Sequence, residues 1–182
     1  TAYTYDSMDR VLTTTDPLGN VTTNTYDENG NLLTTTDPSG TITTNTYHAS
    51  GNLQATQDCL GNISSYAYDG SGNMIRQTDP LGNITTYPYD ASGNQLTQTV
   101  TRIDAQGDPV TMTTTHVYDK LGQLVETIDP DGNVSSIEYN GIGKESARID
   151  KNGHRTEHDY DLQGNLSLIT YPDGTTEFYT YD

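Results

Sequence analysis

The sequence predicts an all-β protein: a repetitive antiparallel β-hairpin meander with about two strands in each 21-residue repeat. Three observations predict it. A Tyr returns at a fixed interval, clusters of Asp, Asn and Gly interrupt the chain about every ten residues, and the stretches between them are rich in Thr, Val, Ile and Tyr. These features are typical of repeat proteins, of regular turns and of strands, respectively. We expect about 17 strands, arranged as a curved or spiralling strip of a shell, tube or fibre.

The recurring Tyr sets the repeat. Its spacing is 21 residues at every step except one, where it is 29. A fixed period of this length indicates an array of similar units. The residues that open the units are Tyr5, Tyr26, Tyr47, Tyr68, Tyr89, Tyr118, Tyr139, Tyr160 and Tyr181.

Each repeat contains two turns of similar chemistry. One follows the recurring Tyr, as in residues 27–31, and is called the Tyr turn below; the other, the Asp-Pro turn, is represented by residues 16–20. Asp at the first position accepts hydrogen bonds from backbone N–H groups, Pro favours a type I turn, and Gly adopts the left-handed conformation. The residues expected to define the repeat are Tyr26, Asp27, Gly30, Asp37, Gly40, Tyr47, Tyr68, Asp79, Pro80, Gly82, Tyr89, Tyr118, Tyr139 and Tyr160.

The single long interval predicts one elongated hairpin around residues 94–117. Eight residues are added between Tyr89 and Tyr118, four on each side of the turn that begins at Asp104. An even addition on both sides lengthens both strands and leaves every side chain on its own face. We interpret residues 1–182 as one repeat array, a fragment of a longer protein, because it begins and ends inside a repeat.

The odd period raises a problem of side-chain direction. Side chains alternate between the two faces of a sheet, so a repeat of 21 residues would change faces at every step. One β-bulge in each repeat restores the pattern, for instance if only one of the two turns carries a Gly bulge. The sequence does not determine which turn that is.

The composition predicts a sheet without an apolar core. Only 31% of the residues are hydrophobic, and there is no Trp and one Phe. Leu32 follows a Tyr turn and should lie beside Tyr26 across the hairpin, as should the equivalent residues of other repeats. Cross-strand pairs of this kind contribute roughly 0.2–1 kcal/mol each. We therefore expect the stability to come from many small cross-strand contributions, and we expect both faces of the sheet to contact solvent.

The net charge of −17 excludes several functions. Nucleic-acid binding calls for a basic surface, and anionic membrane surfaces also attract basic chains. No apolar run is long enough to be inserted into a membrane. Cys59 is the only Cys, so no internal disulfide framework is expected.

The repeat resembles the Rhs/YD-repeat family. The matching segments are the Tyr-Asp units at residues 26–32 and 160–166 and the Asp-Pro links at 16–20, 79–83 and 129–133. The family comprises bacterial Rhs polymorphic toxins, the B and C components of Tc toxins, and teneurins. The resemblance implies a β-sheet strip that spirals into a hollow shell, which in bacterial members encloses a C-terminal toxin. The segment that closes the bacterial shells is not recognisable here.

No recurring catalytic constellation is present, and we expect no enzymatic activity. The Asp residues occupy turn positions, and the four His residues occupy repeat positions; these are His48, His116, His154 and His158. One Asp-Pro turn groups Asp129, Asp131 and Asn133, whose oxygen atoms suit a weak calcium site. We expect no other metal and no cofactor.

These observations favour a structural module of a large secreted or surface-exposed bacterial protein, forming part of a shell around a cargo or toxin domain. Its partners would be neighbouring repeats of the same chain or of other copies. The alternative is an extracellular adhesive or fibre-forming module that binds carbohydrate. Its support is the pairing of aromatic residues on one face, as at Tyr66 and Tyr68 or Tyr87 and Tyr89.

Overall fold

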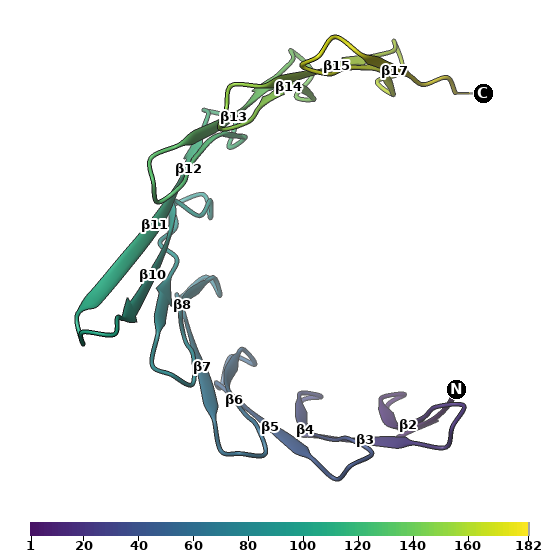
Figure 1. Cartoon of the computed structure of the whole chain (residues 1–182). Helices are drawn as coiled ribbons and strands as arrows, with labels where there is room; N and C mark the ends of the chain where they lie inside the picture. Colours follow the sequence, from purple (N-terminus) through teal and green to yellow (C-terminus); the bar gives the residue numbers. More distant parts are fainter. Residues whose placement is uncertain (182) are drawn as a thin grey trace. The chain divides into compact units, whose positions relative to one another are not determined.

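The computed structural model describes residues 1–181 and contains 17 strands joined in one open antiparallel sheet (Figure 1). No helix occurs among these residues, and so none is available to cross a membrane. The predicted all-β hairpin meander is confirmed. Two strands form in each repeat because the Asp- and Gly-containing clusters turn the chain back at regular intervals.

The chain divides into two compact units. The first contains residues 1–86 and 100–110, and the second contains residues 87–99 and those from 111 onward. Strands of the first unit are β1 (Ala2–Tyr5), β2 (Val11–Thr15), β3 (Val21–Tyr26), β4 (Leu32–Thr36), β5 (Ile42–Tyr47), β6 (Leu53–Gln57), β7 (Ile63–Tyr68), β8 (Met74–Thr78) and β9 (Ile84–Thr86).

The second unit follows the same plan. Its strands are β12 (Leu124–Ile128), β13 (Val134–Tyr139), β14 (Glu145–Ile149), β15 (Arg155–Tyr160), β16 (Leu166–Thr170) and β17 (Thr176–Phe178). The strands β10 (Thr97–Ile103) and β11 (Pro109–Tyr118) contribute to both units, and they have seven and ten residues where the other strands have three to six. The four-residue additions on either side of Asp104 lie in this hairpin.

Both kinds of turn have the same backbone geometry. In the Asp-Pro turn, the N–H of Gly19 donates to the carbonyl of Asp16 at 3.1 Å, and the N–H of Asp16 donates to the carbonyl of Asn20 at 3.0 Å. The Tyr turn at Asp27 has the equivalent pair of bonds. Gly30 has a φ of 91°, which confirms the left-handed conformation expected at this position.

The parity of the repeat is restored by a bulge beyond the Tyr turn. Thr25 pairs with Thr34, whereas Tyr26 pairs with Leu32, so Leu33 is an extra residue on β4. The other Tyr-turn hairpins shift at the same place, next to Tyr5, Tyr47, Tyr68, Tyr118, Tyr139 and Tyr160. The expectation of one such bulge per repeat is confirmed, and because both turns contain a left-handed Gly, this residue does not mark the hairpin that carries it.

The bulge also staggers the strip. Thr13 of β2 pairs with Thr23 of β3, and Thr23 pairs with Thr36 of β4. The residue that lies in line with Thr13 two strands later is thus Thr36, which is 23 positions further on, although the repeat is 21. The second unit behaves identically, since Glu126 pairs with Ser136 and Ser136 with Ile149. Each repeat is therefore displaced by two residues, or about 7 Å, along the strand direction.

The sheet is a single layer without an apolar core. Among the described residues only Ala147 is fully buried, and no large side chain is. Exposed and half-buried residues alternate along β3 and β15, whereas β2, β4 and β16 are half-buried throughout. The expected placement of Tyr26 directly opposite Leu32 across the hairpin is confirmed.

Replacing Gly82 by Val should lower the melting temperature. Gly82 has a φ of 83°, and a Cβ at this position would meet no atom within 4 Å. The cost is therefore backbone strain alone, about 1–2 kcal/mol for a side chain in the left-handed region and more for a β-branched one. Thermal unfolding followed by circular dichroism measures the shift.

The matched control is Asp9→Gly, because Asp9 is the one non-Gly residue with positive φ in the described chain, at 59°. This substitution should raise the melting temperature by relieving the same strain. An unchanged melting temperature in both variants would show that the left-handed turn position does not limit stability.

Candidate functional site: the tyrosine clasp and the acidic turns

The strands of each Asp-Pro hairpin separate as they run away from their turn. Between β4 and β5 the paired residues extend only from Thr36 and Ile42 to Thr34 and Thr44. The first residues of β4 and the last residues of β5 do not pair with each other. There β4 pairs with β3, and β5 pairs with β6. The carbonyl of Leu32 lies in this gap and needs a side-chain partner.

The recurring Tyr closes the gap. The hydroxyl of Tyr47 on β5 donates to the carbonyl of Leu32 on β4 at 2.9 Å, and the side-chain amide of Asn45 donates to the same oxygen at 3.0 Å. The carbonyl oxygen of Asn45 in turn accepts a hydrogen bond from the Thr56 hydroxyl on β6 at 2.9 Å. These side chains connect three consecutive strands. We call the bond between the Tyr hydroxyl and the carbonyl 15 residues earlier the tyrosine clasp.

The clasp recurs along both units. It joins Tyr26 to Val11, Tyr139 to Leu124 and Tyr160 to Glu145 at 2.9, 3.0 and 2.7 Å, and in the elongated repeat it joins Tyr118 to Gln95, 23 residues earlier, at 3.0 Å. Burial raises the pKa of the Tyr118 and Tyr160 hydroxyls, which keeps them protonated and able to donate. These Tyr residues were predicted to lie beside Leu across the hairpin, but their hydroxyl bonds were not predicted. A signal was present: the chain has 14 Tyr and one Phe.

The other repeat residues named from the sequence are distributed along the strip and do not converge on one point. Asp37, Gly40, Asp79, Pro80 and Gly82 lie in Asp-Pro turns, and Asp27 and Gly30 lie in a Tyr turn. The ring of Tyr68 contacts the ring of His48 edge to face, with centroids 6.1 Å apart. Tyr89 forms an isolated β-bridge with Gln95.

The turn carboxylates accept hydrogen bonds from residues of their own turns. One oxygen of Asp16 accepts the N–H groups of Leu18 and Asn20 at 2.8 and 2.9 Å, and the other accepts the side-chain amide of Asn20 at 2.7 Å. The bonds from Asn20 lower the pKa of Asp16, and those from Asn62 lower the pKa of Asp58 in the same way. Hydrogen bonding favours the charged carboxylate, so these groups act as turn anchors.

The calcium candidates form an ordinary turn of this kind. Asp129 accepts the N–H groups of Asp131 and Asn133, both at 2.9 Å, and the side-chain amide of Asn133 at 2.8 Å. Asn133 thus offers its nitrogen, not its oxygen, to the carboxylate. Within residues 1–181 no group of three His, Cys, Asp or Glu side chains is placed to hold a metal ion. Weak calcium binding at Asp129, Asp131 and Asn133 remains a prediction.

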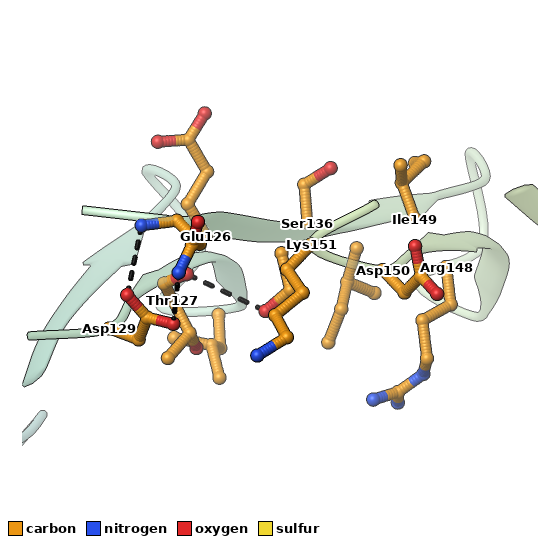
Figure 2. A pocket seen from close by; sticks show the side chains of 12 residues that line it. Glu126, Thr127, Asp129, Ser136, Arg148, Ile149, Asp150 and Lys151 are labelled. Atoms are coloured by element: carbon orange, nitrogen blue, oxygen red, sulfur yellow. Dashed lines mark hydrogen bonds between the residues drawn. The ribbon is translucent and has the colours of Figure 1, made fainter. Parts of the chain in front are cut away.

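A shallow groove of about 310 Å³ follows this turn in the second unit. Figure 2 shows Glu126, Ser136 and Ile149 projecting from one side of the ribbon and Arg148 from the other. The guanidinium of Arg148 is already paired with Glu145, at 2.8 and 3.0 Å. Among its lining residues the groove contains no nucleophile paired with a base.

The family model for the RHS repeat matches this chain at residues 26–63, 47–84, 68–107 and 139–176. These matches cover more than half of the 182 residues. They coincide with the Tyr and Asp-Pro turns described above. A search of curated proteins found no match.

Solved structures with the same fold include Tc toxin components. A crystal structure of TcdB2-TccC3-TEV superposes with a TM-score of 0.74 at 19% identity, over 99% of this chain and 10% of that one. The Photorhabdus luminescens Tc holotoxin pore with a mutated TccC3 gives 0.64 at 20% identity, over 99% and 12%. A crystal structure of TcdB2-TccC3 gives 0.66 at 19% identity, over 99% and 12%. The present chain thus spans about a tenth of the length of these structures.

Replacing Tyr47 by Phe should destabilise the protein by about 0.5–1.5 kcal/mol, the net contribution of one hydrogen bond. The Leu32 carbonyl would still accept the Asn45 amide. Combining Tyr47→Phe with Asn45→Ala should cost more than the sum of the two single changes, because the carbonyl then has no protein donor. Chemical denaturation of the four proteins measures this coupling, and strict additivity would contradict a shared acceptor.

Stability should be constant from pH 7 to about 5 and fall below about pH 4. The pKa values of Asp16 and Asp58 are lower in the folded protein than their ordinary values, chiefly through Asn20 and Asn62. Their contribution is present above the unfolded pKa and is lost as pH falls through the folded pKa. Melting temperatures in 0.15 M salt measure this, since salt screens the overall self-repulsion.

The variant Asp16→Asn with Asp58→Asn should lose part of this acid sensitivity, because Asn can keep the turn without titrating. A double variant with the same acid-dependent loss as the parent would show that other groups control acid unfolding.

Adding EDTA should leave the melting temperature unchanged, because the Asp129 carboxylate is saturated by N–H donors of its own turn. Differential scanning calorimetry with EDTA and with added calcium provides the measurement. A fall of several degrees that calcium reverses would show that calcium sites stabilise the sheet.

Proposed function

The chain belongs to the RHS repeat family, and from this premise we propose that it forms part of the wall of a hollow β-sheet shell that encloses a cargo domain. The cargo would be a toxin, and the protein would be bacterial and secreted or exposed at the cell surface. The partners of the module are then the neighbouring repeats of the same long chain and the enclosed domain. Its role is structural, and no catalytic step is assigned to it.

The staggered single layer is the observation that carries this proposal. A sheet with no fully buried large side chain and no second layer has both faces available to solvent or to an enclosed volume. The displacement of two residues per repeat means that strands are progressively offset along the strip. In closed sheets such an offset accompanies strand tilt, which lets a strip advance along an axis as it winds.

The similar solved structures support the shell proposal. Structures containing TcdB2 and TccC3 share this fold over 99% of the chain, and one of them is a toxin complex in its pore form. Their length, about ten times that of the chain, fits a module that supplies one stretch of a larger wall. The acidic surface also agrees with this role, since it favours neither nucleic acid nor an anionic membrane.

Carbohydrate binding is a second candidate, favoured by one observation. Tyr3 and Tyr5 are both about half exposed and their ring centroids lie 6.3 Å apart, which gives an accessible aromatic surface. Tyr66, which was expected to form a similar pair with Tyr68, is partly covered. A glycan-array experiment with Tyr3→Ala and Tyr5→Ala variants tests this function separately.

Electron cryomicroscopy of the full-length protein that carries residues 1–182 tests the shell proposal. We expect closed hollow particles with density inside, and limited proteolysis in which the enclosed domain is protected until the particle is denatured. Continuous fibres, or an open strip whose remaining domains are digested at once, would overturn the shell and favour the adhesive alternative.

A further inference from the structure

Long side chains after the Tyr turns reach the next Tyr turn along the strip. Arg10 follows the first Tyr turn, and its guanidinium donates to the carbonyl of Asp27 at 2.9 Å. The same group lies 4.8 Å from the centroid of the Tyr26 ring. An Arg at this position therefore joins two consecutive Tyr turns through one hydrogen bond and one cation–π contact.

Lys144 repeats this arrangement in the second unit. Its ammonium group donates to the carbonyl of Gly164 and lies 5.1 Å from the centroid of the Tyr160 ring. The neutral Gln123, one repeat earlier, donates to the carbonyl of Gly143 at 3.0 Å. Long side chains at this position thus donate to a carbonyl of the next Tyr turn, that of its first residue for Arg10 and of its Gly for Gln123 and Lys144, and the two cations also contact the repeat Tyr ring.

At Asn52 the same position is occupied by a short side chain. The turn before it begins with His48 in place of Asp, so Asn52 lacks the carboxylate partner that Asn31 has in Asp27 at 2.8 Å. A groove of about 680 Å³ opens here, between the turns at 48–51 and 69–72. Its walls include Asn52, Tyr68 and the Asp69 turn.

The groove contains the same groups that contact a cationic side chain in other repeats. The Tyr68 ring and the carbonyls of Asp69 and Gly72 correspond to the groups contacted by Arg10 and Lys144. The Asp69 carboxylate is held in its charged form by Ser71 and Asn73 N–H groups, both at 2.9 Å, and adds negative potential. The rings of His48 and Tyr68 meet edge to face, with centroids 6.1 Å apart, and both residues line the groove.

We propose that this groove binds a guanidinium or ammonium group from outside the repeat array, supplied by an Arg or Lys side chain of another polypeptide segment. The site is independent of what the array encloses and goes beyond the shell function. One exposed contact of this kind binds weakly, with a dissociation constant of roughly tens of millimolar or more. Several such contacts along a basic segment would multiply the affinity.

The test is a titration of the isotope-labelled protein with N-acetyl-arginine amide, followed by ¹H–¹⁵N NMR in 0.15 M salt. N-acetyl-citrulline amide, which has the same shape without the charge, is the ligand control. We expect saturable shifts at the backbone amides of Tyr68, Asp69 and Gly72 with the arginine compound only. Equal shifts with citrulline, shifts spread over all acidic turns, or no shift would overturn the proposal.

Two variants make the test specific. Asn52→Arg should fill the groove as Arg10 fills its own, abolish the titration shifts and raise the melting temperature. Asn31→Arg adds the same charge one repeat earlier and should leave the titration intact. Unchanged binding by Asn52→Arg would contradict the assignment.

A further pair of variants covers the case in which Asn52→Arg fails to fold. Tyr68→Phe keeps the aromatic face and should retain binding, whereas Tyr68→Leu should lose it. Equal binding by both would exclude the ring from the site and overturn the proposal.

Discussion

The structure depends on a recurring backbone carbonyl, present at five of the repeat tyrosines, that the backbone ladder of the sheet does not satisfy. Leu32 shows the situation: the ladder between β4 and β5 ends at Thr34, so the Leu32 carbonyl faces a gap between separating strands. An unpaired carbonyl shielded from water is costly, and the Tyr47 hydroxyl removes that cost. The clasp allows the strands to separate without losing a partner, which makes a staggered strip possible.

The remaining stability is distributed over the array. No large residue is fully buried, so removing one side chain leaves no large cavity. The turns contain their own backbone hydrogen bonds, four repeat tyrosines face a Leu across the hairpin, and each clasp joins neighbouring strands. Stability in such an array is approximately a sum of local and nearest-neighbour terms. Extra length then adds strands without requiring a larger core, which suits a protein whose task is to cover a surface.

Much of the fold could be predicted from the sequence, and there are physical reasons why the bulge and the clasp could not. Asp and Gly at fixed turn positions specify local geometry, so the turns and strands follow from sequence alone. The bulge at Leu33 could not be located, because both turns have the same chemistry and the shift occurs beyond the turn. The clasp between Tyr47 and Leu32 could not be found either, since it depends on that register. The N–H partners of Asp129 also could not be assigned from the sequence, and weak calcium binding there stays a prediction.

Nuclear Overhauser contacts measured by NMR on isotope-labelled protein test the central claim most directly. The account predicts contacts from the Tyr47 ring to Leu32 on the neighbouring strand, together with Thr25 opposite Thr34 and Tyr26 opposite Leu32. A Tyr47 ring without contacts to Leu32, combined with a regular register in which Tyr26 stays opposite Leu32 and Thr25 lies opposite Leu33, would contradict it. The strip would then have neither the bulge nor the clasp on which the stagger depends.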